Sequence, residues 1–320
     1  MAGLFGGHGG RQRGLGGGST VPGYTKIKSL DKGGMSEAVS LVKKTETGKV
    51  YVEKRVRIDG SRRQRTMAEL TALKSVERGR NLNHMHDFLF DERTGLCSFI
   101  LEYCDGGSLQ HDIEKQRRGR KNYSDKFVWH VLVGISRALA YVHQGIRDVT
   151  RDSPAWDWNM TCHLDLKPCN VFLSSTNQDS EYPRVVVGDF GCAIRSSDVW
   201  LGMEHPREQR CGTPQWYPPE GRPEMVPRQS LRYGPETDVW QMGATIHTMC
   251  RLLERPDIRV LDLIPEYPPC GERYGESLNW VARRCLHPQF AQRPTAYEMA
   301  TELDRMVSAK GMRQLMTMRG

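Results

Sequence analysis

Residues 163–170, "HLDLKPCN", bring several reactive side chains into one short stretch. Asp165 can accept a proton from a hydroxyl group, and Lys167 can neutralise negative charge two residues away. Asn170 offers an amide oxygen, and Asp189, which follows the apolar run 185–187, offers a carboxylate; both are ligands that Mg²⁺ prefers. Phosphoryl transfer depends on positioning and charge neutralisation more than on covalent chemistry, so this set of side chains predicts that reaction.

An inward-facing lysine lies upstream of this stretch. Residues 38–58 are typical of two strands around a Thr-Gly turn, and the alternation in the second strand places Lys54 on its apolar face. A buried lysine needs an anionic partner or ligand. The next segment predicts a helix over 62–77 whose apolar stripe is formed by Met67, Leu70, Leu73 and Val76. Glu69, the only glutamate between Lys54 and Val76, is the natural partner of Lys54.

The elements that must position these residues divide the chain in two. Residues 1–20 are rich in glycine, so we expect a flexible tail there and a second tail over 309–320. Strands are predicted from residue 24, and helices dominate after residue 110. The longest predicted helices cover 126–143, 236–250 and 295–307. This pattern predicts an α+β fold with a β-rich N-lobe (24–104), a larger helical C-lobe (105–308) and a cleft between them.

Composition excludes several classes of protein. Lys and Arg number 46 against 38 Asp and Glu, a net charge of +8 that could favour nucleic acid or acidic lipid, but the basic residues are scattered and we expect no nucleic-acid partner. No apolar run is long enough for a membrane span. Nine cysteines without a C-x-x-C pair favour a reducing compartment, so we expect an intracellular protein of the cytoplasm or nucleus.

The order of the motifs resembles a eukaryotic protein kinase, and the likeness extends from about residue 24 to 308. It is carried, in chain order, by "YVEK", "HLDLKPCN", "GDFG", "CGTPQWYPPE", "DVWQMG" and "QRPT". Lys167 in the D-x-K-P-x-N version resembles Ser/Thr kinases, and "YVEKRVRI" with Ala38 resembles NIMA-related kinases. H-x-D followed by asparagine also occurs in small-molecule phosphotransferases, but "GTPQWYPPE" is similar to a kinase peptide-binding shelf.

The resemblance implies a role for each matching residue, with ATP and Mg²⁺ as cofactors and a protein Ser/Thr hydroxyl as acceptor. Asp165 and Lys167 match the catalytic base and its cation, and Asn170 and Asp189 match the metal ligands. The matches in the nucleotide site are Leu30, Gly33, Gly34, Ala38, Lys54, Glu69, Glu102 and Cys104. The matches in the activation segment and its supports are Thr213, Glu220, His163, Asp238 and Arg293. Thr213 is expected to bond Asp165 and Lys167, Glu220 to pair with Arg293, and His163 to pack as a structural residue.

The glycine loop departs from the family pattern. Asp31 replaces the first glycine and Ser36 the third, while Gly33 keeps the second. Small residues still let the backbone approach phosphates, but a carboxylate at residue 31 could repel them. Two interpretations stay open: an active kinase whose nucleotide lid grips more loosely, or a pseudokinase that serves as a binding scaffold.

The activation segment departs as well. Leu164 occupies the place where many kinases carry an arginine that binds a phosphate added to this segment. Between Ser197 and Thr213 there is no Ser, Thr or Tyr that could carry such a phosphate. The two absences agree, and they predict activity that does not depend on phosphorylation of the activation segment.

A longer connection than usual, residues 144–162, precedes the catalytic loop. It carries Trp156 and Trp158. Exposed aromatic residues are favoured at interface cores, so this connection could dock a partner; the alternative is that both rings pack locally against the C-lobe.

Overall fold

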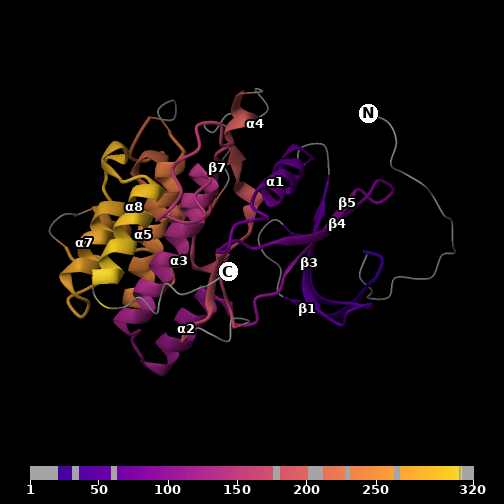
Figure 1. Ribbon diagram of the computed structural model, residues 1–320, viewed down its shortest axis with the longest axis horizontal. Helices are drawn as coiled ribbons and strands as arrows, with labels where there is room; N and C mark the ends of the chain where they lie inside the picture. Colours follow the sequence, from indigo (N-terminus) through magenta and orange to yellow (C-terminus); the bar gives the residue numbers. More distant parts are fainter. Residues whose placement is uncertain are drawn as a thin grey trace.

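The computed structural model describes residues 21–30, 36–58, 63–175, 181–200, 212–227, 231–262, 267–309 and 311. Figure 1 shows a β-rich lobe and a larger helical lobe side by side, with one helix, α1 (Arg63–Ser75), on the β-rich side. The predicted α+β fold of two lobes is therefore confirmed. Seven cysteines of the described residues are free, and Cys192 is disulfide-bonded.

A five-stranded antiparallel sheet forms the N-lobe, in the order β1-β2-β3-β5-β4. Its strands are β1 (Tyr24–Leu30), β2 (Ala38–Lys44), β3 (Val50–Arg57), β4 (Met85–Asp91) and β5 (Leu96–Glu102). The predicted pair of strands around the Thr-Gly turn is β2 and β3, and Gly48 adopts the positive φ of 71° that this turn requires. Lys54 pairs with Val39 on one side and Phe99 on the other, which places it in the middle of the sheet.

Helix α1 buries a face slightly different from the one its apolar spacing predicts. Leu70, Leu73 and the following Val76 are buried as expected, but Met67 is 46% exposed. The prediction for Met67 was wrong because the buried face begins at Thr66 and continues through Glu69. Residues three and four apart share a helix face, so a face that contains residues 66, 69, 70 and 73 turns Met67 outward.

The C-lobe is built around α5, whose residues are nearly all buried. Its helices are α2 (Leu109–Gly119), α3 (Asp125–Gln144), α4 (Ser196–Trp200), α5 (Pro235–Arg251), α6 (Ile258–Asp262), α7 (Glu276–Cys285) and α8 (Ala296–Ala309). Ser108 and Ser124 cap α2 and α3 by accepting a backbone N–H three residues on. α3 packs against both α5 and α8, and α7 covers another side of α5. The three long helices predicted from sequence are α3, α5 and α8.

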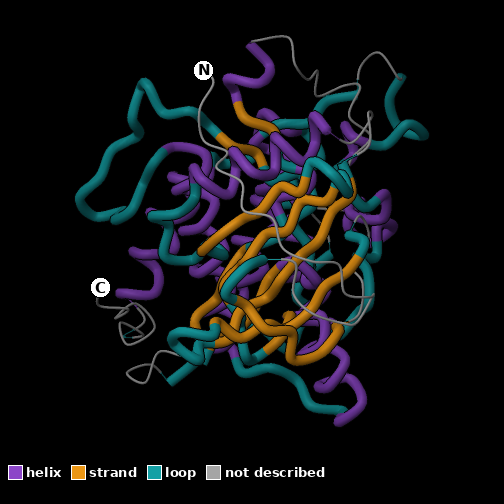
Figure 2. Tube along the Cα trace, turned by 90° about the vertical axis from the view of Figure 1, so that its right-hand side faces the viewer, coloured by secondary structure: helices purple, strands orange, loops and turns teal. Residues whose placement is uncertain are grey.

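Short strands at the boundary between the lobes carry the residues expected to react. They are β6 (Gly107–Ser108), β7 (Thr161–Cys162), β8 (Val171–Ser174), β9 (Arg184–Val187) and β10 (Ile194–Arg195). β8 lies between β6 and β9, and β7 pairs with β10. Figure 2 shows the strands gathered on the viewer's side of the molecule, with most of the helices around and behind them. Asn170 directly precedes β8, and Asp189 lies two residues after the end of β9, so both expected metal ligands are positioned by these strands.

The two tryptophans of the 144–162 connection behave differently. Trp158 packs locally: its Nε1 donates to the Val142 carbonyl at 3.1 Å, and its ring meets Tyr141 edge-on at 5.3 Å. Trp156 is 96% exposed. The predicted local packing is therefore confirmed for Trp158 but not for Trp156. Within the described residues, no helix combines the length and the apolar character needed to cross a membrane.

Candidate active site

Lys54 contacts one carboxylate in its own lobe and one in the other lobe. Its Nζ lies 2.6 Å from Oε1 of Glu69 on α1 and 2.7 Å from Oδ1 of Asp189. Burial alone lowers the pKa of Lys54, but Asp189 and Glu69 outweigh it and hold the pKa above its ordinary value. Burial raises the pKa of Asp189, but the opposite effect of Lys54 is stronger. The resulting pKa is about 2, below the ordinary value. At neutral pH the site therefore holds a charged lysine against an ionised Asp189.

Three side chains hold the carboxylate of Asp165. Thr213 donates its hydroxyl to Oδ1 at 2.8 Å, and Lys167 donates to Oδ2 at 2.7 Å. Asn170 Nδ2 reaches the same Oδ2 at 3.2 Å and the Asp165 backbone carbonyl at 2.8 Å. Lys167 also contacts the Thr213 hydroxyl. These contacts hold Asp165 in one orientation, with a cation beside it.

Asn170 and Asp189 meet at the open end of the β8–β9 hairpin. Val171 pairs with Val187, and the Gly188 N–H donates to the Asn170 carbonyl at 2.9 Å. Because Nδ2 of Asn170 faces Asp165, its Oδ1 is the atom left for a metal, and the Asp189 side chain is 38% exposed at the cleft. Hard oxygen donors at this position fit Mg²⁺.

Asp238, near the start of α5, fixes the backbone of the catalytic loop. Its Oδ2 accepts the His163 N–H and its Oδ1 accepts the Leu164 N–H, both at 2.7 Å. Leu164 has φ of 61°, a left-handed conformation that costs a non-glycine residue roughly 1–2 kcal/mol. Two hydrogen bonds to a fully buried carboxylate offset this cost. The sequence placed Asp238 in this motif but gave no sign that the backbone of Leu164 is strained.

His163 is completely buried beneath the loop. Its Nε2 donates to the Gly188 carbonyl at 2.9 Å, and its Nδ1 accepts the Asp165 N–H at 3.2 Å. The ring lies 5.1 Å from that of Phe190. A neutral ring with both nitrogens bonded to the backbone ties Asp165 to the turn that carries Asp189.

Two further supports on the helices escaped the sequence analysis. Gln241 accepts the Leu166 N–H at 2.9 Å and donates to the carbonyls of Leu164 and Trp216. His143 Nε2 lies 2.8 Å from Oδ2 of Asp238. Gln241 follows Asp238 by three residues on a buried helix, so the pair shares one face. Polar residues at that spacing within an apolar helix are the signal that could have revealed Gln241.

Glu220 and Arg293 form a bidentate pair within the C-lobe. Nη1 and Nη2 of Arg293 lie 2.6 and 2.8 Å from the two carboxylate oxygens. Arg293 also donates to the backbone carbonyls of His287 and Glu236. Both residues are buried, so the fork geometry and the added hydrogen bonds compensate for desolvation. The pair secures the segment that follows Thr213.

The roof of the cleft differs by one residue from the sequence prediction. Val39 pairs with Lys54, and Leu30 pairs with Val39, so all three side chains share one face of the sheet. Ala38 pairs with Arg55 and lies on the opposite face. The prediction that Ala38 lines the nucleotide site therefore does not agree with the register, and Val39 is the residue of β2 that shares a face with Lys54. Gly33 and Gly34 lie outside the described residues.

A family model described as the protein kinase domain matches residues 24–302. The chain belongs to the protein kinase family. The expectation of a protein-kinase fold is thereby confirmed.

NIMA-related kinases are among the relatives of this kinase. It is 25% identical to serine/threonine-protein kinase Nek1 of Toxoplasma gondii, over 86% of this chain and 17% of that protein. It is also 25% identical to the probable serine/threonine-protein kinase nek2 of Dictyostelium discoideum and to Nek2 of Mus musculus. Those alignments cover 86% and 88% of this chain, and 61% and 59% of the relatives. The chain thus spans less than two thirds of the length of these relatives.

The residues predicted to form the hinge, Glu102 and Cys104, lie at and just after the end of β5. Glu102 forms an ion pair with Arg184 of β9, and its backbone carbonyl accepts Asn83 Nδ2 at 3.1 Å. The Cys104 carbonyl accepts the Gly107 N–H at 3.1 Å. Among the described residues, no acceptor is bonded to the Cys104 N–H, so this group is a donor that an adenine ring could engage. Burial raises the pKa of the Cys104 thiol to about 12, so this side chain is neutral.

Leu164 packs where other kinases carry a phosphate-binding arginine. It forms an apolar cluster with Cys162 of β7 and Ile194 of β10, against which Met160 and Tyr233 pack; we call these five residues the Leu164 cluster. Leu164 itself is 5% exposed. The cluster joins the catalytic loop to the strand that follows Asp189.

Hydrogen bonds extend this anchorage to the start of the activation segment. Asn159 accepts the Ser197 N–H and the Ser196 hydroxyl through Oδ1, each at 3.0 Å. The Ser196 N–H donates to the Met160 carbonyl at 2.8 Å, and Arg195 pairs with Asp198 at 2.6 Å. Neutral contacts and one local ion pair therefore hold this part of the segment against the 144–162 connection.

Proposed function

We propose that this chain is an active serine/threonine protein kinase that transfers the γ-phosphate of ATP to a protein hydroxyl. The observation that carries the proposal is the state of the charged groups. Lys54 contacts both Glu69 and Asp189, while Asp165 is held by Thr213 and Lys167. A chain that no longer used these groups would have no functional need to keep buried charges in this arrangement, since each is costly to bury.

Each residue has a distinct part in the proposed reaction. Asp165 accepts the proton of the substrate hydroxyl as that oxygen bonds to phosphorus, and Lys167 beside it balances the charge of the transferring group. Lys54, oriented by Glu69, binds the phosphates of the nucleotide. The Cys104 N–H and the face that carries Leu30 and Val39 contact the adenine.

Asn170 and Asp189 are the residues that would hold Mg²⁺. When bound, Mg²⁺ supplies positive charge to the phosphate oxygens. Lys54 keeps Asp189 ionised and turned toward the cleft, which prepares the carboxylate for a cation. Asn170 is prepared in a different way, because its two hydrogen bonds to Asp165 fix the amide plane.

A Ser/Thr acceptor on a protein is the substrate class that fits best. Lys167 in the D-x-K-P-x-N loop supports this choice, as do the names of the relatives, which are serine/threonine-protein kinases. Residues 24–308 would then form one catalytic domain, with the acceptor peptide lying near Thr213 and the Glu220–Arg293 pair. The 144–162 connection, with its exposed Trp156, remains a proposed docking element.

Two substitutions test the proposal. Asp165→Asn keeps the shape of the side chain but removes the base, and Lys54→Met removes the phosphate contact. We expect each to lower magnesium-dependent phosphate transfer to a generic protein substrate by about 100- to 10,000-fold. Arg118→Ala, on an exposed face of α2, is the control and should keep full activity. Equal transfer by wild type and both site variants would refute the enzyme proposal.

A pseudokinase scaffold is the second candidate, because Asp31 and Ser36 stand where the family has glycines. It predicts nucleotide binding or partner binding without transfer. Measuring ATP binding and phosphate transfer on the same preparation separates the two. Binding with no transfer above that of Asp165→Asn supports the scaffold.

A further inference from the structure

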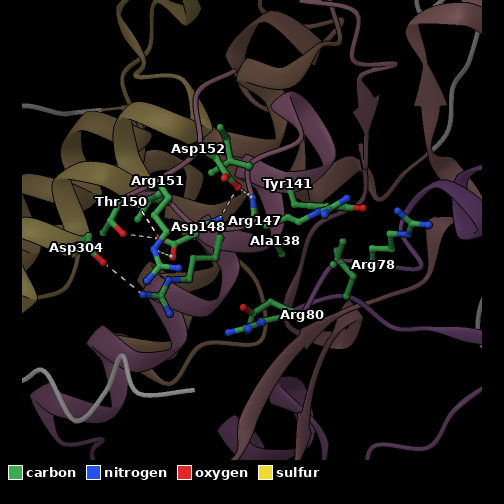
Figure 3. Close-up of a pocket in the computed structure, with 16 residues that line it drawn as sticks. Arg78, Arg80, Ala138, Tyr141, Arg147, Asp148, Thr150, Arg151, Asp152 and Asp304 are labelled. Atoms are coloured by element: carbon green, nitrogen blue, oxygen red, sulfur yellow. Dashed lines mark hydrogen bonds and ion pairs between the residues drawn. The ribbon is translucent and has the colours of Figure 1, made fainter. Parts of the chain in front are cut away.

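A cavity of about 580 Å³ lies away from the active-site residues, where the lobes meet behind the hinge. Its walls come from the 78–82 segment between α1 and β4, from α3, from residues 146–152 and from Asp304 of α8. Figure 3 shows Arg78 and Arg80 on one side and the 147–152 segment on the other. The volume lies in the range of pockets that hold a small molecule, so a single projecting side chain fits it.

Arginines dominate the charge of this cavity. Five line it, against three aspartates: Arg78, Arg80, Arg137, Arg147 and Arg151, with Asp148, Asp152 and Asp304. The cavity therefore has two positive charges in excess. Guanidinium groups bind phosphate oxygens through paired hydrogen bonds, which a single ammonium cannot reproduce.

The three aspartates are already engaged. Asp304 lies 3.4 Å from Arg137, and Asp148 accepts the Thr150 N–H and hydroxyl at 2.9 and 2.7 Å. Asp152 accepts the backbone N–H groups of Arg147 and Asp148. The hydrogen bonds that Asp148 accepts lower its pKa, chiefly through the Thr150 hydroxyl. The negative charge of Asp148 is therefore stabilised within its own turn.

Arg78 and Arg147 face the cavity without a carboxylate partner. Among the described residues, no Asp or Glu oxygen lies within ion-pair distance of either guanidinium. Tyr141 interacts with both residues. Its hydroxyl forms a hydrogen bond with the Arg147 side chain, and the charge of Arg78 acts to lower the pKa of that hydroxyl. Both residues are exposed and line the cavity from different segments of the chain, Arg78 from the 78–82 segment and Arg147 from the 147–152 segment (Figure 3).

We propose that this cavity binds a phosphorylated serine or threonine side chain on a peptide segment of a protein partner. The phosphate would lie between Arg78 and Arg147, and the flanking peptide would follow the 147–152 segment. The proposal goes beyond the proposed catalytic function, since it concerns a separate site and needs no phosphate transfer.

The aspartates favour a single phosphate over an extended polyanion. A nucleic-acid strand or an anionic membrane would carry further charges past Asp148, Asp152 and Asp304, and each like-charge contact opposes binding. A hollow also fits a projecting side chain better than a flat bilayer surface. A lone phosphate group on a peptide meets the two guanidinium groups and avoids the carboxylates.

The test measures binding by fluorescence polarisation. The protein is the full chain with Asp165→Asn, so that it phosphorylates no peptide. It is first treated with phosphatase, which is removed before the probes are added. The probes are fluorescent degenerate peptide libraries with a fixed central phosphoserine, serine or glutamate. We expect saturable binding of the phosphoserine library only, weakened at least 10-fold by Arg78→Ala/Arg147→Ala. Arg147→Lys should give an intermediate loss, because lysine keeps the charge but not the bidentate contact.

The matched control removes the same charge from α2. Lys115→Ala/Arg118→Ala lies on an exposed surface and should leave binding unchanged. Circular dichroism and the thermal midpoint establish that each variant is folded. Equal binding of the phosphoserine and serine libraries overturns the proposal, and so does an equal loss in the two double variants. Stronger binding to phosphatidylserine vesicles or to single-stranded DNA than to the phosphoserine library, lost in Arg78→Ala/Arg147→Ala, also overturns it in favour of those ligands.

Discussion

Two regions lie on either side of Asp165, and different kinds of interaction stabilise them: ion pairs in one and apolar contacts in the other. On the cleft side, Lys54 forms ion pairs with Glu69 of its own lobe and with Asp189 of the other lobe. On the side of the activation segment, the Leu164 cluster joins the catalytic loop to β10 through apolar contacts within one lobe. Asp238 serves the second region by fixing the backbone of His163 and Leu164.

The difference shows which part of this kinase can be regulated through charge. The Lys54–Glu69 pair depends on the position of α1, and the Lys54–Asp189 pair depends on what occupies the cleft. Each fails when one partner is removed. Apolar contacts within one lobe depend on shape, and they respond little to salt or to added phosphate. We therefore expect the charged region to control catalysis and the Leu164 cluster to control stability.

Glu69→Gln should cause the largest effect on activity among changes outside the reacting residues. The amide keeps the volume of the side chain but removes its charge, so Lys54 keeps only Asp189 as a charged partner. We expect kcat/KM for protein phosphorylation to fall about 100-fold, since orientation of a charged group toward a phosphate commonly contributes this much. Steady-state kinetics with varied ATP provides the measurement.

A control on the same helix separates charge from helix stability. Met67→Gln changes an exposed residue of α1 and should leave kcat/KM within about 2-fold of wild type, because surface substitutions rarely matter. An equal loss in both variants would mean that α1 itself, and not the Lys54–Glu69 pair, limits activity.

Leu164→Arg should lower the stability of the folded protein and should not create a phosphate-dependent activity. An arginine at a position that is 5% exposed and packed against Cys162 and Ile194 would bury its charge in an apolar cluster, and the nearby Asp238 carboxylate already accepts two backbone N–H groups. We expect the free energy of unfolding in urea to fall by about 2–4 kcal/mol, the cost of an unpaired buried charge together with lost packing. Leu164→Met conserves volume and should cost less than about 1.5 kcal/mol. Unchanged stability of the arginine variant would contradict the apolar anchorage.

Patterns of local alternation and spacing predicted much of the fold and of the charged region. The turn between β2 and β3, the inward direction of Lys54 and its pairing with Glu69 all followed from alternation and helix spacing. These features depend on neighbours in sequence, where one pattern fixes one geometry. The roles assigned to the site residues came from the resemblance to kinases, and they stay predictions.

Long-range packing set the limits of the sequence analysis. Ala38 was placed at the cleft, but only the pairing of Val39 with Lys54 reveals which residue of β2 faces it. Met67 matched the apolar stripe, yet the buried face of α1 begins at Thr66. Gln241 and the φ of Leu164 depend on contacts between segments 74 to 77 residues apart, which no local pattern encodes.

Phosphatase treatment should cause the smallest effect. Leu164 cannot bind a phosphate, and residues 198–212 contain no Ser, Thr or Tyr to carry one. We expect kcat/KM of the purified kinase to change less than about 2-fold after complete dephosphorylation, because the Leu164 cluster already holds the catalytic loop against β10 without a phosphate. Mass spectrometry verifies the removal, and a kinase with the usual phosphate-binding arginine, treated in parallel, should lose most of its activity. A loss of 10-fold or more in this chain, restored by rephosphorylation, would show that charge regulates the second region as well. Ser196→Ala and Ser197→Ala, in the described part of the segment, would then identify the acceptor.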